Sequence, residues 1–236
     1  MLSNNTKLII TGGVGVGKTT TINSVCQALT NKGVKYIVVP EYIDGDENGN
    51  NMLDKFINHD ITAFEFQYYI LQYFDDYLSK LKIAGDEILI FERLPDDSVT
   101  CFANINVKNK LISEEEFKVL YTTCVNLDKK YNLPSYFTNF SNNDLLFCKT
   151  FRTGDNVNEI ISRLNYSIKN NKNLLVGLYN SNDECLLRIR QRNRPSEVKS
   201  YTIDVVNRFN THYEIIYNIL RNNRHLEYED LHSLII

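Results

Sequence analysis

A glycine-rich segment near the start of the chain has the residue types and spacing that bind phosphate. It matches the pattern G-x-x-x-x-G-K-[ST], with Gly12 and Gly17 followed by Lys18 and Thr19. Glycines let backbone N–H groups turn toward phosphate oxygens, and the N-terminus of the following helix adds partial positive charge. We expect Lys18 to reach the outer phosphates of a nucleoside triphosphate and the Thr19 hydroxyl to bind Mg²⁺. The predicted phosphate-binding residues are Gly12, Gly13, Val14, Gly15, Val16, Gly17, Lys18, Thr19 and Thr20.

Two acidic residues follow apolar runs that are typical of buried strands. Glu41 comes after residues 36–39, and Glu92 and Arg93 come after residues 87–91. The carboxyl ends of parallel strands border the crevice in which α/β proteins bind ligands. There Glu41 could accept the proton of an attacking hydroxyl, Glu92 could bind Mg²⁺, and Arg93 could contact the acceptor. Taken singly, such a glutamate is more often a solvated loop residue, and a Glu-Arg pair is more often a surface ion pair.

A cluster of arginines spans residues 188–197. Arg188 and Arg192 are four residues apart and share a helix face, and Arg194 follows them closely. Clustered like charges repel one another unless an anion lies among them, and a triphosphate is a suitable anion. We therefore expect a lid that closes on phosphates. The alternatives are a solvated basic face and an RNA-binding patch, but no basic stripe interleaved with aromatic residues accompanies the cluster.

Strands alternate with helices along the chain, which places these segments on an α/β scaffold. We predict strands at residues 7–11, 36–39, 87–91 and 173–179, with a short fifth strand at 225–228. Residues 144–150 could also form a strand, and residues 44–52 are predicted to be a loop. The predicted helices are 18–31, 61–83, 113–131, 159–169 and 200–220. The pattern indicates one domain over residues 1–236, with a doubly wound, mostly parallel sheet of about five strands flanked by helices and an arginine-rich lid.

Charge and composition exclude several function classes. The net charge is −3, which argues against a general nucleic-acid coat or a basic membrane-surface module. No apolar run approaches the ~20 residues that span a bilayer, and residues 1–5 do not resemble a secretory signal. The five cysteines are scattered without a C-x-x-C pair, so a disulfide framework and a zinc site are both poorly supported. We expect a soluble protein of a reducing compartment, the cytoplasm.

Taken together, these segments resemble the deoxynucleoside kinase family, most closely its herpesvirus-type thymidine kinase branch. The resemblance rests on the threonines at 19–21, the Pro40-Glu41 pair, the Arg93-x-Pro95 spacing and the pattern R-x-x-x-R-x-R-P-x-E at 188–197. It covers residues 5–125 and 173–220 and makes residues 132–172 look like an insertion. It implies a P-loop kinase fold, ATP and Mg²⁺ as cofactors, and a homodimer packed through helices 61–83 and 113–131. The viral branch would place the protein in the cytoplasm of an infected host cell, where it would supply nucleotides for DNA synthesis by salvage.

The resemblance also implies a role for individual residues of the catalytic site. Glu41 resembles the base that activates a deoxyribose 5′-hydroxyl, and Arg93 resembles the residue beside the 5′ oxygen. Glu92 looks like the acid associated with magnesium, with Thr19 as the other metal ligand. Arg188, Arg192 and Arg194 look like lid arginines that reach the phosphates, and Glu197 matches the acid that binds the 3′-hydroxyl. The implied catalytic residues are thus Lys18, Glu41, Arg93 and Arg192.

The base of the nucleoside is expected to lie between Gln67, which matches a base-reading glutamine, and Phe102, which matches a stacking aromatic. Ser98 falls where purine- and cytidine-preferring members carry an aspartate, and Phe74 falls where they carry an arginine. With Ile70, this leaves an apolar wall that favours thymidine, keeps deoxycytidine open and crowds a purine. Phe66 belongs to the same wall, and Asp96 and Asp97 introduce acid near it. Phe56 occupies the position of a tyrosine that contacts the 3′-hydroxyl in relatives.

Two other functions remain open. The first is a nucleoside monophosphate kinase such as thymidylate kinase, which shares the P-loop, the acid-arginine pair and the lid. Those enzymes carry an arginine for the acceptor's phosphate where this chain has Pro40, preceded by Val39. The second is a non-catalytic P-loop switch, which would not need Glu41, Glu92 and Arg93.

Overall fold

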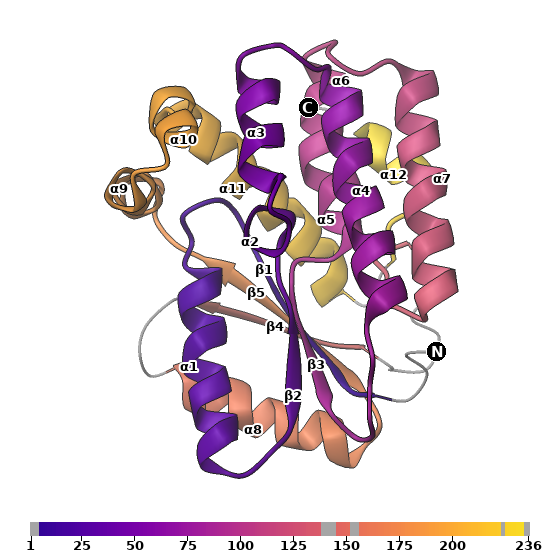
Figure 1. Ribbon diagram of the computed structural model, residues 1–236, viewed down its shortest axis with the longest axis vertical. Helices are drawn as coiled ribbons and strands as arrows, with labels where there is room; N and C mark the ends of the chain where they lie inside the picture. Colours follow the sequence, from indigo (N-terminus) through magenta and orange to yellow (C-terminus); the bar gives the residue numbers. More distant parts are fainter. Residues whose placement is uncertain (1–4, 138–144, 152–155, 223–224, 234–236) are drawn as a thin grey trace.

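A parallel sheet forms the centre of the computed structural model, which describes residues 5–137, 145–151, 156–222 and 225–233 (Figure 1). Within these residues the sheet has five strands in the order β2-β3-β1-β5-β4, and every neighbouring pair is parallel. The strands are β1 (Lys7–Thr11), β2 (Tyr36–Val39), β3 (Ile88–Glu92), β4 (Leu145–Phe151) and β5 (Asn173–Tyr179). The predicted doubly wound α/β fold is confirmed.

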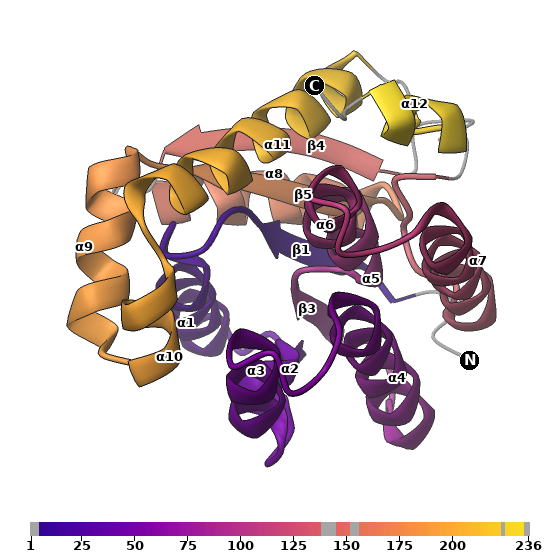
Figure 2. The same ribbon diagram turned by 90° about the horizontal axis from the view of Figure 1, so that it is seen from above.

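Successive residues of the central strand supply two hydrophobic cores, one on each face of the sheet. Leu8 and Ile10 belong to the core covered by α1 (Lys18–Asn31) and α8 (Asn156–Lys169). Ile9, which points to the opposite face, belongs to the core under α4 (Ala63–Lys80), α7 (Glu114–Tyr131) and α11 (Ile203–Arg221). The view from above shows α1 on one side of the sheet and α4 and α7 on the other (Figure 2). Burial of both faces explains why the strand sequences are continuously apolar.

Capping boxes begin the long helices α4 and α7. Ser113 accepts a hydrogen bond from the backbone of Glu116, whose carboxylate accepts in return from the backbone of Ser113, as the sequence predicted. Thr62 and Glu65 form the same arrangement at the start of α4. The cap at Thr62 makes α4 begin at Ala63, and the helix ends at Lys80, so α4 is shorter than the predicted helix at 61–83.

Two predicted elements are wrong. Residues 225–227 are irregular, and Tyr228 begins helix α12 (Tyr228–Ser233), so no strand forms at 225–228. The fifth strand of the sheet is instead β4, which corresponds to the possible strand at 144–150. Residue 144 itself lies outside the described part of the chain. Residues 225–228 alternate polar and apolar types over only four positions, which is too short to distinguish a strand from a single buried contact. Leu226 is buried, and its N–H donates to the carbonyl oxygen of Tyr136.

The predicted loop at 44–52 is largely helical. It contains the end of α2 (Tyr42–Gly45) and much of α3 (Gly49–Ile57). Its polar side chains face solvent, whereas Leu53 is buried in the core and Met52 and Phe56 pack against that core. The spacing of these apolar residues was masked by the glycine and asparagine residues around them.

The arginine-rich segment forms two helices rather than one. Helix α9 (Asn182–Arg192) ends at Asn193, whose φ of 55° is left-handed, and Pro195 then begins α10 (Pro195–Ser200). Another interrupted helix follows β3 and consists of α5 (Pro95–Asp97), a π-helix (Ser98–Ala103) and α6 (Asn104–Lys108). None of the described helices combines the length and apolar character that a bilayer crossing needs.

Candidate active site

The glycine-rich segment forms a tight loop between β1 and α1. Gly15 and Gly17 have φ of 76° and 104°, in the region that favours glycine. A Cβ on Gly15 would lie 2.4 Å from the carbonyl oxygen of Cys185 at the start of α9, so no side chain fits there. The predicted phosphate-binding segment therefore lies at the N-terminus of α1, directly beside the lid.

Lys18 is buried at the base of this loop. Its Nζ donates to the carbonyl oxygen of Gly13 at 3.2 Å and lies 3.8 Å from Oε1 of Glu92. The pKa of Lys18 is lowered to about 8, mainly by burial and then by the charge of Arg93, while Glu41 and Glu92 partly oppose the shift. A phosphate group at this position would add the negative charge that the buried ammonium lacks.

Thr19 and Glu92 lie together where the sequence predicts a magnesium ion. The Thr19 hydroxyl donates to both carboxylate oxygens of Glu92, at 3.0 Å and 3.2 Å. Burial raises the pKa of Glu92, and Lys18 partly offsets this effect. A hydroxyl and a carboxylate at the end of a strand provide the oxygen ligands that Mg²⁺ prefers, so this pair fits the ion.

Arg93 holds Glu41 at the opposite side of the loop. Its Nε and Nη2 donate to the carbonyl oxygen of Gly12 at 3.3 Å and 2.9 Å, and its Nη1 binds Oε1 of Glu41. Burial by itself raises the pKa of Glu41, but Arg93 and Lys18 outweigh it and hold this pKa below its ordinary value. Glu41 lines the pocket as a carboxylate, and its Oε2 has no partner among the described residues.

Two tyrosines of α4 fix the segment that carries Glu41. Tyr73 donates its hydroxyl to the carbonyl oxygen of Pro40 at 2.8 Å, and Tyr77 donates to that of Val38 at 3.2 Å. The sequence analysis did not identify these residues. Their four-residue spacing on one helix face was the available signal.

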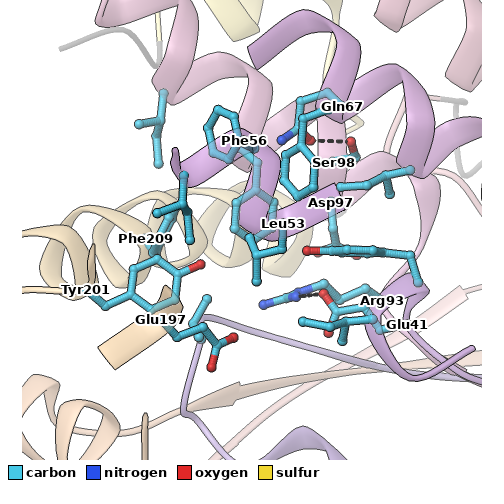
Figure 3. Close-up of a pocket in the computed structure, with 18 of the residues that line it drawn as sticks. Glu41, Leu53, Phe56, Gln67, Arg93, Asp97, Ser98, Glu197, Tyr201 and Phe209 are labelled. Atoms are coloured by element: carbon cyan, nitrogen blue, oxygen red, sulfur yellow. Dashed lines mark hydrogen bonds and ion pairs between the residues drawn. The ribbon is translucent and has the colours of Figure 1, made fainter. Parts of the chain in front are cut away.

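The far end of the pocket holds the predicted base-binding residues (Figure 3). Gln67 is buried, and its Oε1 accepts a hydrogen bond from Ser98 at 2.6 Å. Phe56 stacks on Phe66 with ring centroids 4.7 Å apart, and the guanidinium carbon of Arg93 lies 4.9 Å from the centroid of the Phe102 ring. The predicted residues that line this pocket are Phe56, Phe66, Gln67, Ile70, Phe74, Ser98 and Phe102.

The lid arginines differ in what they contact. Arg188 donates to the carbonyl oxygen of Val16 at 3.2 Å, within the phosphate loop. Arg192 lines the pocket and pairs with Glu197, whereas Arg194 lies 2.8 Å from Asp44 of α2 and 3.6 Å from Glu197. All three arginines thus pair with carboxylates, Arg188 with Glu184 at 2.7 Å, but only Arg188 also contacts the phosphate loop.

Asp96 and Asp97, both predicted near the base, face different ways. Asp97 lines the pocket, where it accepts from the backbone of Leu94 at 2.7 Å and from the Thr11 hydroxyl. Asp96 instead accepts from the Ser135 hydroxyl at 2.8 Å and from the backbone of Tyr136 at 2.7 Å, in the core behind the site. The prediction for Asp96 is therefore wrong, because adjacent helical residues point about 100° apart.

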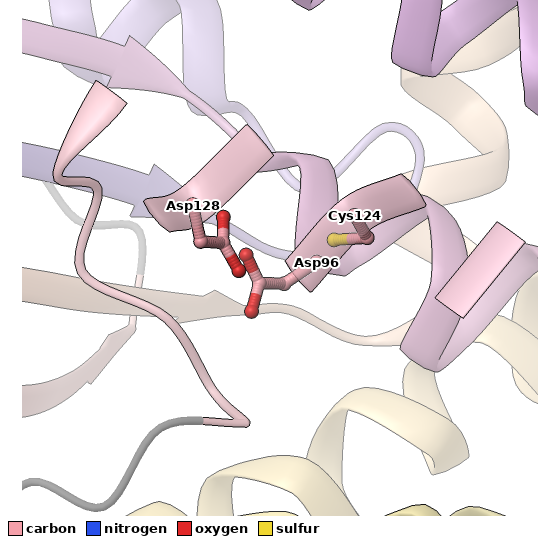
Figure 4. A group of neighbouring side chains, drawn as sticks. All are labelled: Asp96, Cys124 and Asp128. Carbon is pink, nitrogen blue, oxygen red and sulfur yellow. The ribbon is translucent and has the colours of Figure 1, made fainter. Parts of the chain in front are cut away.

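The core side of Asp96 carries two further ionisable groups, Cys124 and Asp128 (Figure 4). Ligand atoms of all three lie within 4.8 Å of one another. Burial raises the pKa of Asp96 to about 7 and that of Asp128 well above its ordinary range. Burial therefore favours the protonated, neutral carboxyl groups, and we assign no metal ion to this cluster.

Further pocket residues were missed by the sequence analysis. Leu53 and Phe209 add apolar surface, and Tyr42 and Tyr201 add hydroxyl groups beside the acids. Tyr42 follows Glu41 directly, so its place beside a candidate catalytic residue was the available signal. The others come from helices whose orientation the sequence does not reveal.

Known proteins resemble this chain both in sequence and in fold. A sequence model of the family described as "Deoxynucleoside kinase" matches residues 8–138, a span that includes the phosphate loop, Glu41, Gln67 and Arg93. The chain is also similar to the solved structure of a deoxyadenosine kinase from M. mycoides with bound dATP. The identity is 18%, the TM-score is 0.55, and the match covers 97% of this chain and 95% of that chain. At this identity the likeness shows the fold alone, and no curated protein matches the chain in sequence.

Proposed function

The chain belongs to the deoxynucleoside kinase family, and we propose that it phosphorylates the 5′-hydroxyl of a pyrimidine deoxynucleoside, preferring thymidine, with ATP and Mg²⁺. One observation carries the proposal. A single pocket is lined at one end by Lys18, Glu41 and Arg93, and at the other by the buried amide of Gln67. The first set suits phosphoryl transfer, and the second suits recognition of a base.

The donor end supports ATP as the phosphoryl source. The phosphate loop, Lys18 and Arg188 would hold its phosphates, with Arg192 joining them when it leaves Glu197. Thr19 and Glu92 would hold Mg²⁺, which neutralises charge on the phosphate oxygens when bound.

The acceptor end supports transfer to a hydroxyl group. One oxygen of Glu41 is fixed by Arg93, so the other is available to accept the proton of the attacking 5′-hydroxyl. The guanidinium group of Arg93 stays close to the reacting oxygens and stabilises negative charge there. Since the pKa of Glu41 is lowered, this base is ionised throughout the neutral range.

The residues around Gln67, at the base-binding end of the pocket, support thymine as the preferred base. Ser98 occupies one lone pair of Gln67 Oε1, and no described residue forms a hydrogen bond with Nε2. The amide can thus accept from N3–H of thymine and donate to O4. Ile70 and Phe74 form the apolar wall beside it, which suits the thymine methyl group and narrows the space for a purine.

A kinase of deoxynucleoside monophosphates is the nearest alternative. It would need a cation for the acceptor's phosphate at the position of Pro40, where the chain has none. The deoxyadenosine kinase of similar fold makes deoxyadenosine a necessary comparison substrate. We further propose that the protein is a homodimer, with α4 and α7 at its interface.

A competition assay tests the proposal. Purified protein is given ATP, Mg²⁺ and equal amounts of thymidine, deoxycytidine, deoxyadenosine, deoxyguanosine and thymidylate, with Glu41→Gln as the control variant. We expect thymidine 5′-monophosphate as the main product of the wild type and little product from Glu41→Gln. Preferred use of a purine would reject the pyrimidine assignment, and ATP hydrolysis without transfer to any acceptor would reject the kinase assignment.

A further inference from the structure

Asp97 is a buried acid beside Arg93 to which the proposed reaction assigns no role. It borders the pocket on the same side as Arg93 (Figure 3), but only 1% of its surface is exposed. Both side-chain oxygens accept hydrogen bonds from the protein, Oδ1 from the Thr11 hydroxyl and Oδ2 from the backbone N–H of Leu94 at 2.7 Å. The buried hydroxyl of Tyr136 lies 3.4 Å from each oxygen. Because protein donors occupy both oxygens, a link within the protein suits this group better than contact with a substrate.

The two donors to Asp97 come from different parts of the active site. Thr11 is the last residue of β1 and directly precedes Gly12, where the phosphate loop begins. Leu94 directly follows Arg93, just beyond the end of β3. Since β1 and β3 are neighbours in the sheet, Asp97 bridges the carboxyl ends of two adjacent strands.

Arg93 has a backbone conformation that needs support from its surroundings. Its φ of 65° is left-handed, and a residue other than glycine keeps such a conformation only where neighbouring contacts hold it. The peptide groups on both sides of its Cα are held. The N–H of Arg93 donates to the carbonyl oxygen of Ile10 at 3.1 Å, and the N–H of Leu94 donates to Asp97. Asp97 therefore supplies the side-chain half of this support.

The backbone conformation of Arg93 in turn directs its side chain. The guanidinium group donates to the carbonyl oxygen of Gly12 at 2.9 Å and pairs with Glu41. A closed ring of hydrogen bonds and short stretches of backbone thus runs from Asp97 through Thr11 and Gly12 to Arg93, and returns through the next backbone N–H. A change at Asp97 would therefore reach Glu41 through Arg93.

We propose that Asp97 is a positioning residue for phosphoryl transfer, because its two hydrogen bonds keep Arg93 in the left-handed conformation that directs the guanidinium group into the active site. The inference rests on the proposed function and adds to it a residue that acts through Arg93. A misplacement of about 1 Å at a catalytic group can lower the rate by about 10²-fold. The loop amides and Lys18 would still hold ATP, so we expect the loss to fall on kcat.

The test measures kcat and substrate affinity separately in three variants. Asp97→Asn replaces one acceptor oxygen by an amide group that can accept from neither donor, and it should lower kcat by roughly 10²-fold. Thr11→Val removes one hydrogen bond but keeps the side-chain shape, and it should lower kcat by roughly ten-fold. Thr11→Ser keeps the hydroxyl and should stay within about three-fold of the wild type. The dissociation constants of ATP and nucleoside, measured by calorimetry, should change by less than about three-fold in all three variants.

Thr100→Val is the matched control for Thr11→Val. Thr100 is equally buried, but its hydroxyl donates to the backbone carbonyl oxygen of Asp96 at 2.8 Å, and it does not line the pocket. The same chemical change there should leave kcat within about two-fold of the wild type. Thermal unfolding of each variant checks that it is folded, and if Asp97→Asn does not fold, the comparison of Thr11→Val with Thr11→Ser decides.

Three results would overturn the role of Asp97. These are a kcat close to that of the wild type in both Asp97→Asn and Thr11→Val, an equal fall of kcat in Thr11→Val and Thr100→Val, and a loss confined to substrate affinity. The first means that the link is not needed, the second that only core packing matters, and the third that Asp97 serves binding. Each of these leaves the kinase assignment intact, because the wild type is active. Absence of transfer by the wild type would instead overturn both proposals.

Discussion

Arg93 and Glu41 form a buried ion pair that joins the phosphate loop to the acceptor side of the pocket. The same guanidinium group donates to Gly12, so a change at either partner alters both halves of the site. Arg93 itself has a φ of 65°, which most side chains avoid. This left-handed conformation directly after β3 turns the side chain back toward the loop.

Replacing Glu41 by Gln should lower kcat by roughly 10²–10⁴-fold, because an amide cannot accept the proton of the attacking hydroxyl. The amide oxygen of Gln still accepts from Arg93, so the binding of ATP should change little. Rapid-quench turnover and calorimetric ATP binding measure the two effects. A kcat within ten-fold of the wild type would show that Glu41 is not the base.

ATP affinity should fall as the pH rises above about 8. Lys18 has a pKa of about 8 in the free protein, and phosphate oxygens favour its protonated form. Below pH 8 the ammonium group of Lys18 is already charged, so the affinity for ATP does not change with pH. Above pH 8 Lys18 must take up a proton when ATP binds, and the affinity for ATP falls by up to about ten-fold per pH unit. Titration calorimetry between pH 6.5 and 9.5, in buffers of different ionisation heat, measures the uptake. The variant Lys18→Ala should bind ATP weakly and without this dependence.

Protein stability should decrease as the pH rises from about 4 toward 7, because of the pair Asp96 and Asp128. Unfolded aspartates release their protons near pH 3.8, whereas burial keeps Asp96 protonated up to about 7 and Asp128 beyond it. The folded state therefore binds more protons across this window, which stabilises it at the acid end. We expect a difference on the order of a few kcal/mol in the free energy of unfolding, measured by urea denaturation.

The variant Asp128→Asn should flatten this dependence. Its amide can donate to the free oxygen of Asp96, which lowers the pKa of Asp96 and removes the second acid. Asp76→Asn, an exposed change on α4, is the control and should leave the curve as it is. An unchanged slope in Asp128→Asn would show that the pair does not hold its protons.

Ser98→Ala should weaken the use of thymidine by roughly five-fold, because the amide of Gln67 loses the hydrogen bond that orients it. The double variant Phe74→Arg with Ser98→Asp should go further and shift preference toward deoxycytidine or a purine. Ratios of kcat/KM across the four deoxynucleosides measure both effects. A thymidine preference that survives the double variant would place base selection elsewhere in the pocket.

The sequence predicted the parts of the site that depend on strand ends. Glu41, Glu92 and Arg93 each follow an apolar run, and the carboxyl ends of parallel strands meet at one edge, so their convergence follows from the pattern. The phosphate loop was predicted in full because its chemistry lies in consecutive residues.

The remainder depends on tertiary packing, which local patterns do not specify. Tyr201 lines the pocket because the chain turns at Asn193, between α9 and α10. Asp96 points away from the pocket because α5 begins at Pro95, which sets the direction of each side chain that follows. The fifth strand was misplaced at residues 225–228, because a strand and a buried irregular segment look alike over four residues.

The ion pair between Arg192 and Glu197 would have a thermodynamic consequence under the proposed function. If ATP phosphates draw Arg192 to the loop and a sugar hydroxyl binds Glu197, each ligand breaks the same ion pair. The affinities for ATP and nucleoside would then be linked, and each ligand would change the affinity of the other by the same factor. We therefore expect positive heterotropic cooperativity that depends on one side chain of the lid.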